Sequence, residues 1–195
     1  MKVDVIYATA NPLDVIAIAA GTSTGHMNPD HRRVRRCYES GHMSVFEHAS
    51  VTLAVTGISR ACSHQLVRHR MASFVQLSQR YTRLDGDDWY VMPPALAEAD
   101  KGGTFELQFL LARHCYEDAL KAGVKPEDAR FLLPEATKTD ITMTVNVREL
   151  FHFLDLRCDS HAQWEIRDLA NAIRDEVDGI NDQWHELMSL WEVTK

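Results

Sequence analysis

The clearest indication of the fold lies in residues 50–81, which read SVTLAVTGISRACSHQLVRHRMASFVQLSQRY. Apolar residues alternate with polar or small ones over residues 50–56, which is the pattern of a half-buried strand. We expect Gly57 to turn the chain before a helix over residues 59–69. Residues 73–81 alternate again. The stretch therefore predicts a strand, a helix and a second extended segment.

Further strands and helices are expected on both sides of this stretch. Residues 2–8 and 141–145 are rich in β-branched residues and predict strands. Caps and prolines predict a helix from Asn11-Pro12 to near Gly21 and another from Asn28-Pro29 to near Gly41. Helical periodicity predicts a helix over 104–122, and a short helix is expected from Pro126 to before Pro134. Two more helices are expected, one capped by Asn146 with Glu149 at its third position and one capped by Ser160 with Gln163 that ends near Gly179. Short strands in the first half and helices in the second predict an α+β fold. Without a repeat or a linker, residues 1–195 are expected to form a single domain.

The composition is that of a globular protein. Of the 195 residues, 45% are hydrophobic, which is enough to bury a core. No apolar stretch is long enough to span a membrane, and Asp4 interrupts any secretory signal. The cysteines (Cys37, Cys62, Cys115 and Cys158) form no Cys-x-x-Cys pair, so neither zinc nor a disulfide framework is indicated. We expect a cytoplasmic protein with reduced thiols.

Positive charge is concentrated in one segment of an acidic chain. The net charge is -7, which argues against nucleic-acid binding by the whole surface. Residues 48–84 nevertheless contain no acidic residue. They contain Arg60, Arg68, Arg70, Arg80, Arg83, His48, His64 and His69. This distribution favours a site for a small anion over one for a polymer. For Arg83 we expect a solvated surface. For the arginines at 32–36 we also expect a solvated helix surface, with contact to a polyanion or a partner as the alternative.

The sequence Arg68-His69-Arg70, followed by Ser78 and Arg80, suggests how such an anion is held. Arginine forks match phosphate oxygens, and a hydroxyl adds a neutral donor. The chain has no Gly-x-Gly-x-x-Gly motif and no P-loop. The sequence therefore predicts phosphate binding through side chains.

This motif resembles the Arg-His-Arg-x7-Ser motif of the flavin-dependent thymidylate synthases. Residues 41–48 resemble the family's segment upstream of the motif, and residues 146–157 and 159–167 resemble its segments downstream. The resemblance covers residues 41–167 in the same order and spacing.

The resemblance implies site residues and an activity. FAD would contact Ser44, Arg68, His69, Arg70, Gln76, Asn146, Val147, Arg148 and His152, with His42 near the flavin ring. The substrate dUMP would contact Gln65, Leu66, Val67, Arg68, Gln76, Leu77, Ser78, Gln79, Arg80, Arg130 and Arg157. Many relatives have Glu where this chain has Gln76. The implied reaction is the methylation of dUMP to dTMP, with methylenetetrahydrofolate as carbon donor and NADPH as the source of electrons for FAD.

The implied chemistry does not need a cysteine nucleophile. None of the four cysteines lies in a Pro-Cys-His sequence, the context used by the cysteine-dependent thymidylate synthases. Arg157, placed against the uracil edge, would instead stabilise the charge that grows as C5 attacks. Ser78 is expected to be a ligand and not a nucleophile. Because one small domain offers few large clefts, we expect a homo-oligomer, a tetramer with shared sites.

Two other classes of function stay open at this stage. One is a non-catalytic nucleotide- or nucleic-acid-binding protein, and the other is a different flavoprotein oxidoreductase. Neither explains the segment from Asn146 to Arg157. A metal site formed by His42, His48 and His64 lacks the carboxylate–histidine spacing of such sites, so we expect no metal.

Overall fold

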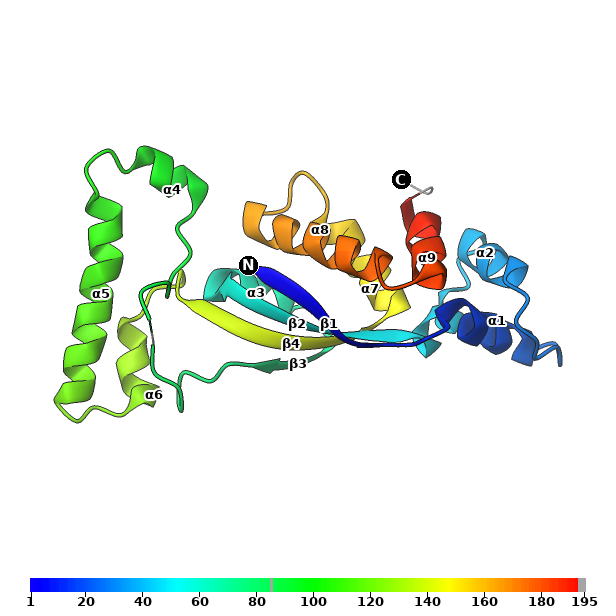
Figure 1. Ribbon diagram of the computed structural model, residues 1–195, viewed down its shortest axis with the longest axis horizontal. Helices are drawn as coiled ribbons and strands as arrows, with labels where there is room; N and C mark the ends of the chain where they lie inside the picture. Colours follow the sequence, from blue (N-terminus) through cyan, green and yellow to red (C-terminus); the bar gives the residue numbers. More distant parts are fainter. Residues whose placement is uncertain (85, 193–195) are drawn as a thin grey trace. The chain divides into compact units, whose positions relative to one another are not determined.

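The computed structural model describes residues 1–84 and 86–192 and contains a four-stranded sheet with helices between and after its strands (Figure 1). The elements are β1 (Lys2–Ala8), α1 (Pro12–Thr22), α2 (Arg32–Glu39), the 3-10 helix η1 (Met43–His48), β2 (Ser50–Ser59), α3 (Arg60–Leu66), β3 (Ser73–Gln76), α4 (Pro94–Ala99), α5 (Thr104–Lys121), α6 (Pro126–Ala129), the 3-10 helix η2 (Arg130–Leu132), β4 (Lys138–Asn146), α7 (Val147–Arg157), α8 (Trp164–Asp178) and α9 (Asp182–Glu192). The α+β class expected from the sequence is confirmed.

The chain packs as two compact units, each built from separate segments of sequence. The first unit consists of residues 1–55, 65–75 and 142–192, and the second of residues 56–64 and 76–141. The strands follow the order β1-β2-β4-β3 across the sheet. No single linker divides the units, because the chain passes between them several times. The single domain expected for residues 1–195 stays a prediction.

The core of the first unit forms where helices cover the sheet. Val51, Leu53 and Val55 of β2 are fully buried, as their alternation predicts. Helix α8 packs against β1 and presents a buried stripe at helical spacing that includes Ile166 and Ile173. Helices α7, α8 and α9 contact one another in order. This packing fixes α7, which carries much of the candidate site.

Several boundaries differ from the sequence predictions in and around β2. Gly57 does not end the strand: it takes a φ of +72°, donates its N–H to Asp140 Oδ1 at 2.9 Å, and β2 continues to Ser59. Glycine tolerates this conformation because it has no Cβ. Helix α3 ends at Leu66, before the expected His69. The extended segment ends at Gln76, and a turn follows at residues 79–81.

Other differences concern caps. Helix α2 begins at Arg32 and not at Pro29, and Gly21 lies inside α1, whereas Gly41 has the expected positive φ of +71°. Helix α8 is capped by Gln163 and not by Ser160, since the Gln163 side chain accepts from the N–H groups of Glu165 and Ile166. Helices α4 and α9 are not foreseen by the sequence patterns.

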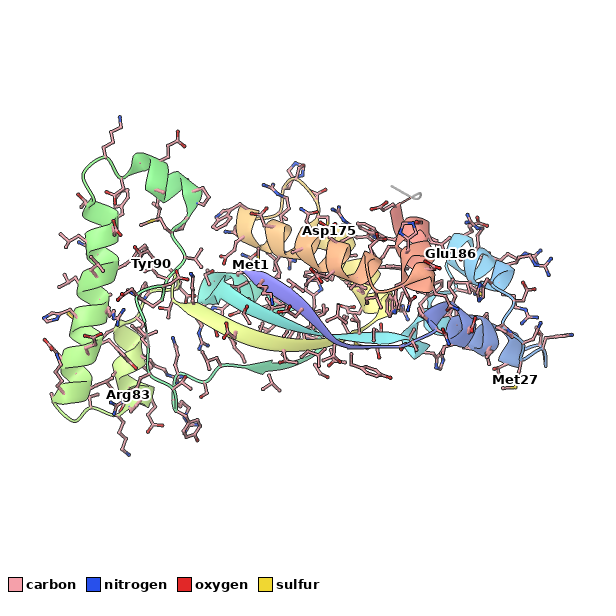
Figure 2. All side chains as sticks on the ribbon, viewed as in Figure 1. Met1, Met27, Arg83, Tyr90, Asp175 and Glu186 are labelled. Carbon is pink, nitrogen blue, oxygen red and sulfur yellow. The ribbon has the colours of Figure 1, made fainter. Side chains whose placement is uncertain are left out.

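The second unit contains α5, whose predicted range is confirmed. Its helices α5 and α6 and the 3-10 helix η2 contact one another. Leu107, Leu110 and Leu111 of α5 are exposed by half or more. Arg83 is exposed, as expected (Figure 2). None of the helices described at 1–84 and 86–192 is both long and apolar enough to cross a membrane.

Candidate functional site

Helix α7 begins at the end of β4 and carries polar side chains over its whole length. Asn146 caps it, with its Oδ1 accepting from the Glu149 N–H at 2.9 Å, as the sequence predicts. This satisfies one of the N–H groups that a helix start leaves unpaired. The cap therefore fixes the first turn, from which Arg148 and Glu149 project.

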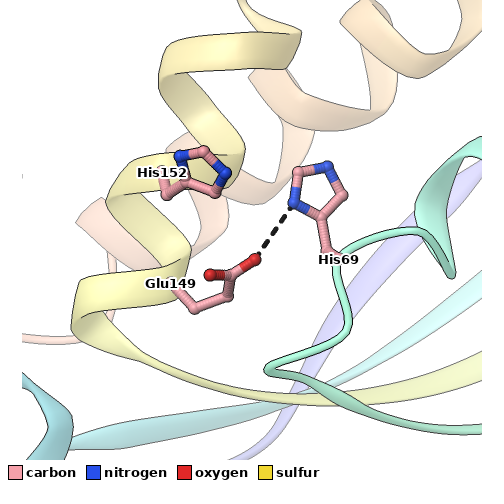
Figure 3. Close-up of side chains that lie close together, drawn as sticks. All are labelled: His69, Glu149 and His152. Atoms are coloured by element: carbon pink, nitrogen blue, oxygen red, sulfur yellow. Dashed lines mark hydrogen bonds and ion pairs between the residues drawn. The ribbon is translucent and has the colours of Figure 1, made fainter.

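His69 lies in the loop after α3, and its ring lies beside α7, next to Glu149 and His152 (Figure 3). Its side chain is only 3% exposed. Its Nδ1 lies 3.2 Å from Glu149 Oε1, and its Nε2 accepts from Arg157 Nε at 3.2 Å. The ring also stands edge-on to Phe153, with centroids 5.0 Å apart. One buried imidazole thus joins two charged residues of α7.

The charge state of His69 follows from its surroundings. Burial lowers the pKa of His69 from its ordinary value of 6.5 and the Arg157 charge lowers it further, whereas the hydrogen bond that His69 donates to Glu149 opposes both. The imidazole is therefore neutral at pH 7. Because an arginine Nε always carries a proton, Nε2 of His69 must be the acceptor, and the ring proton sits on Nδ1 facing Glu149.

His69, Glu149 and His152 also form a cluster of metal-ligand type. One ligand atom from each lies within 4.8 Å of the others. However, both nitrogens of His69 already have hydrogen-bond partners, and one of them is the cation Arg157. A dication here would displace the Nδ1 proton beside a fixed positive charge, which is electrostatically unfavourable. The expectation of no metal stays a prediction.

A cavity of about 510 Å³ opens beside His69. It is lined by Arg68, His69, Arg70, Met71, Glu149, His152, Leu156 and Arg157. Three arginines against one carboxylate make this cavity cationic. It can take phosphate or another anion through charge-assisted hydrogen bonds.

A larger cavity of about 770 Å³ adjoins the first, because Met71, Glu149 and His152 line both. Its other lining residues are Tyr38, Glu39, Met43, Glu47, Asn146, Arg148, Phe151 and Asp155. The Tyr38 and Phe151 rings meet edge to face with centroids 5.6 Å apart. Arg148 Nη1 donates to Glu47 Oε1 at 2.5 Å. The cavity can therefore hold a flat ring system with polar edges.

The second unit has a smaller cavity of about 370 Å³ around two arginines. It is lined by Arg60, His64, Gln79, Arg130, Phe131, Leu133, Pro134 and Glu135. Burial and the neighbouring charge of Arg130 lower the pKa of Arg60. Its Nη2 donates to the Leu77 carbonyl at 2.8 Å, whereas its buried Nε has no partner among residues 1–84 and 86–192. The local potential favours an anion here too.

Gln76, Ser78 and Arg80 also belong to the second unit. Gln76 Nε2 donates to Ser63 Oγ at 2.8 Å and to Thr139 Oγ1 at 3.2 Å. Ser78 Oγ accepts from the Arg80 N–H, and the Arg80 side chain pairs with Glu127 at 3.2 Å. The amide nitrogen of Gln76 is therefore already committed to protein partners.

The structure sorts the site residues expected from the sequence into three groups. One group lines the two cavities of the first unit: Arg68, His69, Arg70, Asn146, Arg148, His152 and Arg157. Gln79 and Arg130 line the cavity of the second unit. Ser44, His42, Gln65, Leu66, Val67, Gln76, Leu77, Ser78, Arg80 and Val147 line none of these cavities. Leu66 and Val147 are buried, so only their backbone could meet a ligand.

Sequence reasoning missed other lining residues. Tyr38, Met43, Met71 and Phe151 give no signal beyond ordinary hydrophobicity. Glu149 is expected only as the residue whose N–H the cap binds. Its position three residues before His152, on the same helix face, is the signal that could have identified it.

Known proteins resemble this chain over nearly its whole length. The family model described as thymidylate synthase complementing protein matches residues 4–180. A flavin-dependent thymidylate synthase of Geobacter sulfurreducens is 40% identical over 193 residues, which covers 92% of this chain and 83% of that protein. One of Pyrococcus furiosus is 37% identical, which covers 91% and 79%.

The fold has a counterpart among solved structures. The crystal structure of the flavin-dependent thymidylate synthase ThyX from Helicobacter pylori, complexed with FAD and dUMP, is similar with a TM-score of 0.77 and 26% identity. The similarity covers 99% of each chain.

Proposed function

Because this chain belongs to the flavin-dependent thymidylate synthase family, we propose that it converts dUMP to dTMP with bound FAD, taking the carbon from methylenetetrahydrofolate and electrons from NADPH. The observation that carries the proposal is the contact of Arg157 with His69 at the wall of a cavity that two further arginines line. Such a cavity suits a nucleotide phosphate or an anionic base edge.

The residues of the first unit fit FAD by their chemistry. Arg68 and Arg70 offer charge for a diphosphate, and the adjoining cavity offers the Tyr38 and Phe151 rings beside Arg148 and His152. When bound, FAD supplies the hydride that reduces the transferred carbon to a methyl group. The part of the protein is to bind, to orient and to exclude water.

Arg157 is the residue to which we assign the catalytic role. C5 of uracil can attack an electrophilic carbon when the ring becomes enolate-like, with negative charge shared between C5 and the edge formed by N3 and the carbonyl oxygens. A guanidinium aimed at that edge stabilises the negative charge that develops there. Among the described residues, no partner accepts from Nη1 or Nη2 of Arg157, so these N–H groups are available for a ligand.

The cysteines do not take part in this proposal. Cys62 is fully buried, and no cysteine lines any of the three cavities described above. The uracil ring is therefore activated without a covalent bond from a thiolate.

We also propose that the protein is a homo-oligomer, a tetramer, in which neighbouring chains complete each site. The exposed Leu107, Leu110 and Leu111 on α5 support this, since three large apolar side chains in two turns of one helix form a surface suited to a partner. The expected dUMP ligands are divided between the two units, which is compatible with a site built from more than one chain.

The test is the reaction itself. The purified protein, supplied with FAD, dUMP, methylenetetrahydrofolate and NADPH, should form dTMP, and omission of any one component should abolish product. A protein that binds no FAD by calorimetry and forms no dTMP would disprove the proposal.

A further inference from the structure

The backbone and the side chain of Glu149 make hydrogen bonds to different partners. The backbone N–H is occupied by the Asn146 cap, whereas the carboxylate, 12% exposed, points to His69 (Figure 3). Within residues 1–84 and 86–192, this bond to His69 is the one hydrogen bond that the side chain makes. Helix capping therefore does not account for the carboxylate.

The spacing along α7 explains why Glu149 and Arg157 are linked through a third residue. Glu149 and Arg157 are eight residues apart, or roughly 12 Å along a helix axis. They share one face of α7, but they are too far apart to touch. The imidazole of His69 lies between them and contacts both, each at 3.2 Å. Phe153 and His152, which lie between them on the same helix, hold the ring edge-on at centroid distances of 5.0 and 5.9 Å.

The position of the proton on the His69 ring determines whether Nε2 can accept the hydrogen bond from Arg157. Arg157 Nε can only donate, so Nε2 of His69 must keep its lone pair. A neutral imidazole keeps it only when the proton is on Nδ1, where Glu149 Oε1 accepts it. Without that acceptor, the proton could move to Nε2 and would then oppose the N–H of Arg157.

We propose that Glu149 is a positioning residue, which holds His69 in the Nδ1–H tautomer so that Nε2 fixes the plane of the Arg157 guanidinium. The inference rests on the role proposed above for Arg157. Glu149 does not touch the uracil itself. It determines the orientation in which the free Nη1 and Nη2 groups meet the ring.

The test is a double-mutant cycle with kcat for dTMP formation at saturating FAD and dUMP. Glu149→Met removes the acceptor but keeps the length of the side chain, and we expect kcat to fall roughly 10- to 100-fold, the range found for partners that orient metal-binding histidines. Glu149→Gln keeps an oxygen that accepts from Nδ1–H and should retain most of kcat. In the Arg157→Ala background, Glu149→Met should cause no further loss, because its effect passes through Arg157.

The matched control is Glu186→Met, at an exposed glutamate of α9 that lines none of the cavities (Figure 2). It should leave kcat unchanged. If Glu149→Met does not fold, Glu149→Ala takes its place in the cycle. Losses that multiply in the double variant would overturn the inference, and so would an unchanged kcat in a folded Glu149→Met.

A second measurement does not depend on turnover. Nitrogen-15 NMR of labelled histidine, with the His69 signals assigned through His69→Gln, reports which ring nitrogen bears the proton. We expect Nδ1–H in the wild type and in Glu149→Gln, and a shift toward Nε2–H in Glu149→Met. A wild-type His69 protonated on Nε2 would refute the inference. If the wild type formed no dTMP, the proposed function would fail, while this spectrum would still decide the role of Glu149.

Discussion

Gln76 Nε2 donates to Ser63 Oγ across 2.8 Å, and Ser63 in turn donates its own hydroxyl proton to the Arg60 carbonyl at 3.0 Å. Ser63 is fully buried and has used its one proton, so it can only accept from residue 76. An amide satisfies this requirement, and a carboxylate cannot. This explains why glutamine suits position 76 in this chain.

Gln76→Glu should therefore destabilise this protein. The carboxylate would face the lone pairs of Ser63 Oγ, and leaving a buried polar group unsatisfied costs about 1–3 kcal/mol. Urea denaturation of both proteins at pH 7 measures the difference. In a Ser63→Ala background the cost should shrink, because the opposing oxygen is gone. An equal or greater stability of Gln76→Glu would show that the hydroxyl reorients at no cost.

Arg157→Ala should fold and bind FAD but turn over dUMP slowly. Loss of a charge aimed at the developing negative charge typically reduces kcat by about 10²–10³-fold. Steady-state kinetics at saturating dUMP give kcat, and the flavin absorbance verifies that FAD remains bound. Near-normal dTMP formation by this variant would remove Arg157 from the mechanism.

The lowered pKa of His69 predicts a particular pH dependence of stability. A group that folding makes harder to protonate contributes its full stability above its unfolded pKa and loses it as pH falls toward the folded value. The wild type should thus lose stability as the pH drops below 6.5, because unfolding allows His69 to take up a proton. Unfolding free energies between pH 5 and 8 test this, with His69→Gln as the comparison. If both proteins show the same slope, the loss comes from other groups.

Replacing Cys37, Cys62, Cys115 and Cys158 by serine should leave dTMP formation largely intact. Cys62 is fully buried, so its replacement should lower the melting temperature, because a buried thiol behaves as a small apolar group. Activity and melting curves of the fourfold variant separate the two effects. Complete inactivity of a folded, FAD-bound Cys62→Ser or Cys158→Ser protein would instead indicate covalent catalysis.

Mixed oligomers should reveal whether neighbouring chains share a site. Arg70 and Arg157 line the same cavity of one chain and so form a poor pair for complementation. Arg130 lies in the second unit and Arg157 in the first, so Arg130→Ala and Arg157→Ala form the better pair. Each variant alone should be nearly inactive, and co-refolded chains should regain part of the activity. A stable mixed oligomer without recovery would mean that one chain supplies both arginines.

The elements with strong local signals could be predicted from the sequence. The alternation in β2 gives the correct buried face, the range of α5 is predicted to within a residue, and the cap at Asn146 is correct. These features depend on side-chain period and on hydrogen bonds between residues at most four apart, which are present in the sequence itself. The extent of β2 past Gly57 is not such a feature, because it depends on β4, which lies beside β2 in the sheet and whose Asp140 side chain accepts from the Gly57 N–H.

For the candidate site, too, some features could be predicted from the sequence and others depend on the tertiary structure. The sequence alone predicts, through its resemblance to the family, that Arg68, His69, Arg70 and the helix from Val147 to Arg157 belong to one functional set. Only the tertiary structure decides that His69 is buried and lies between Glu149 and Arg157, which are 80 and 88 residues away in sequence. Packing of the α3–β3 loop against α7 brings them together, removes water from the imidazole and so lowers the pKa of His69. A periodic pattern contains no information on such a contact, since the partners are chosen by the fold and not by their neighbours in the chain.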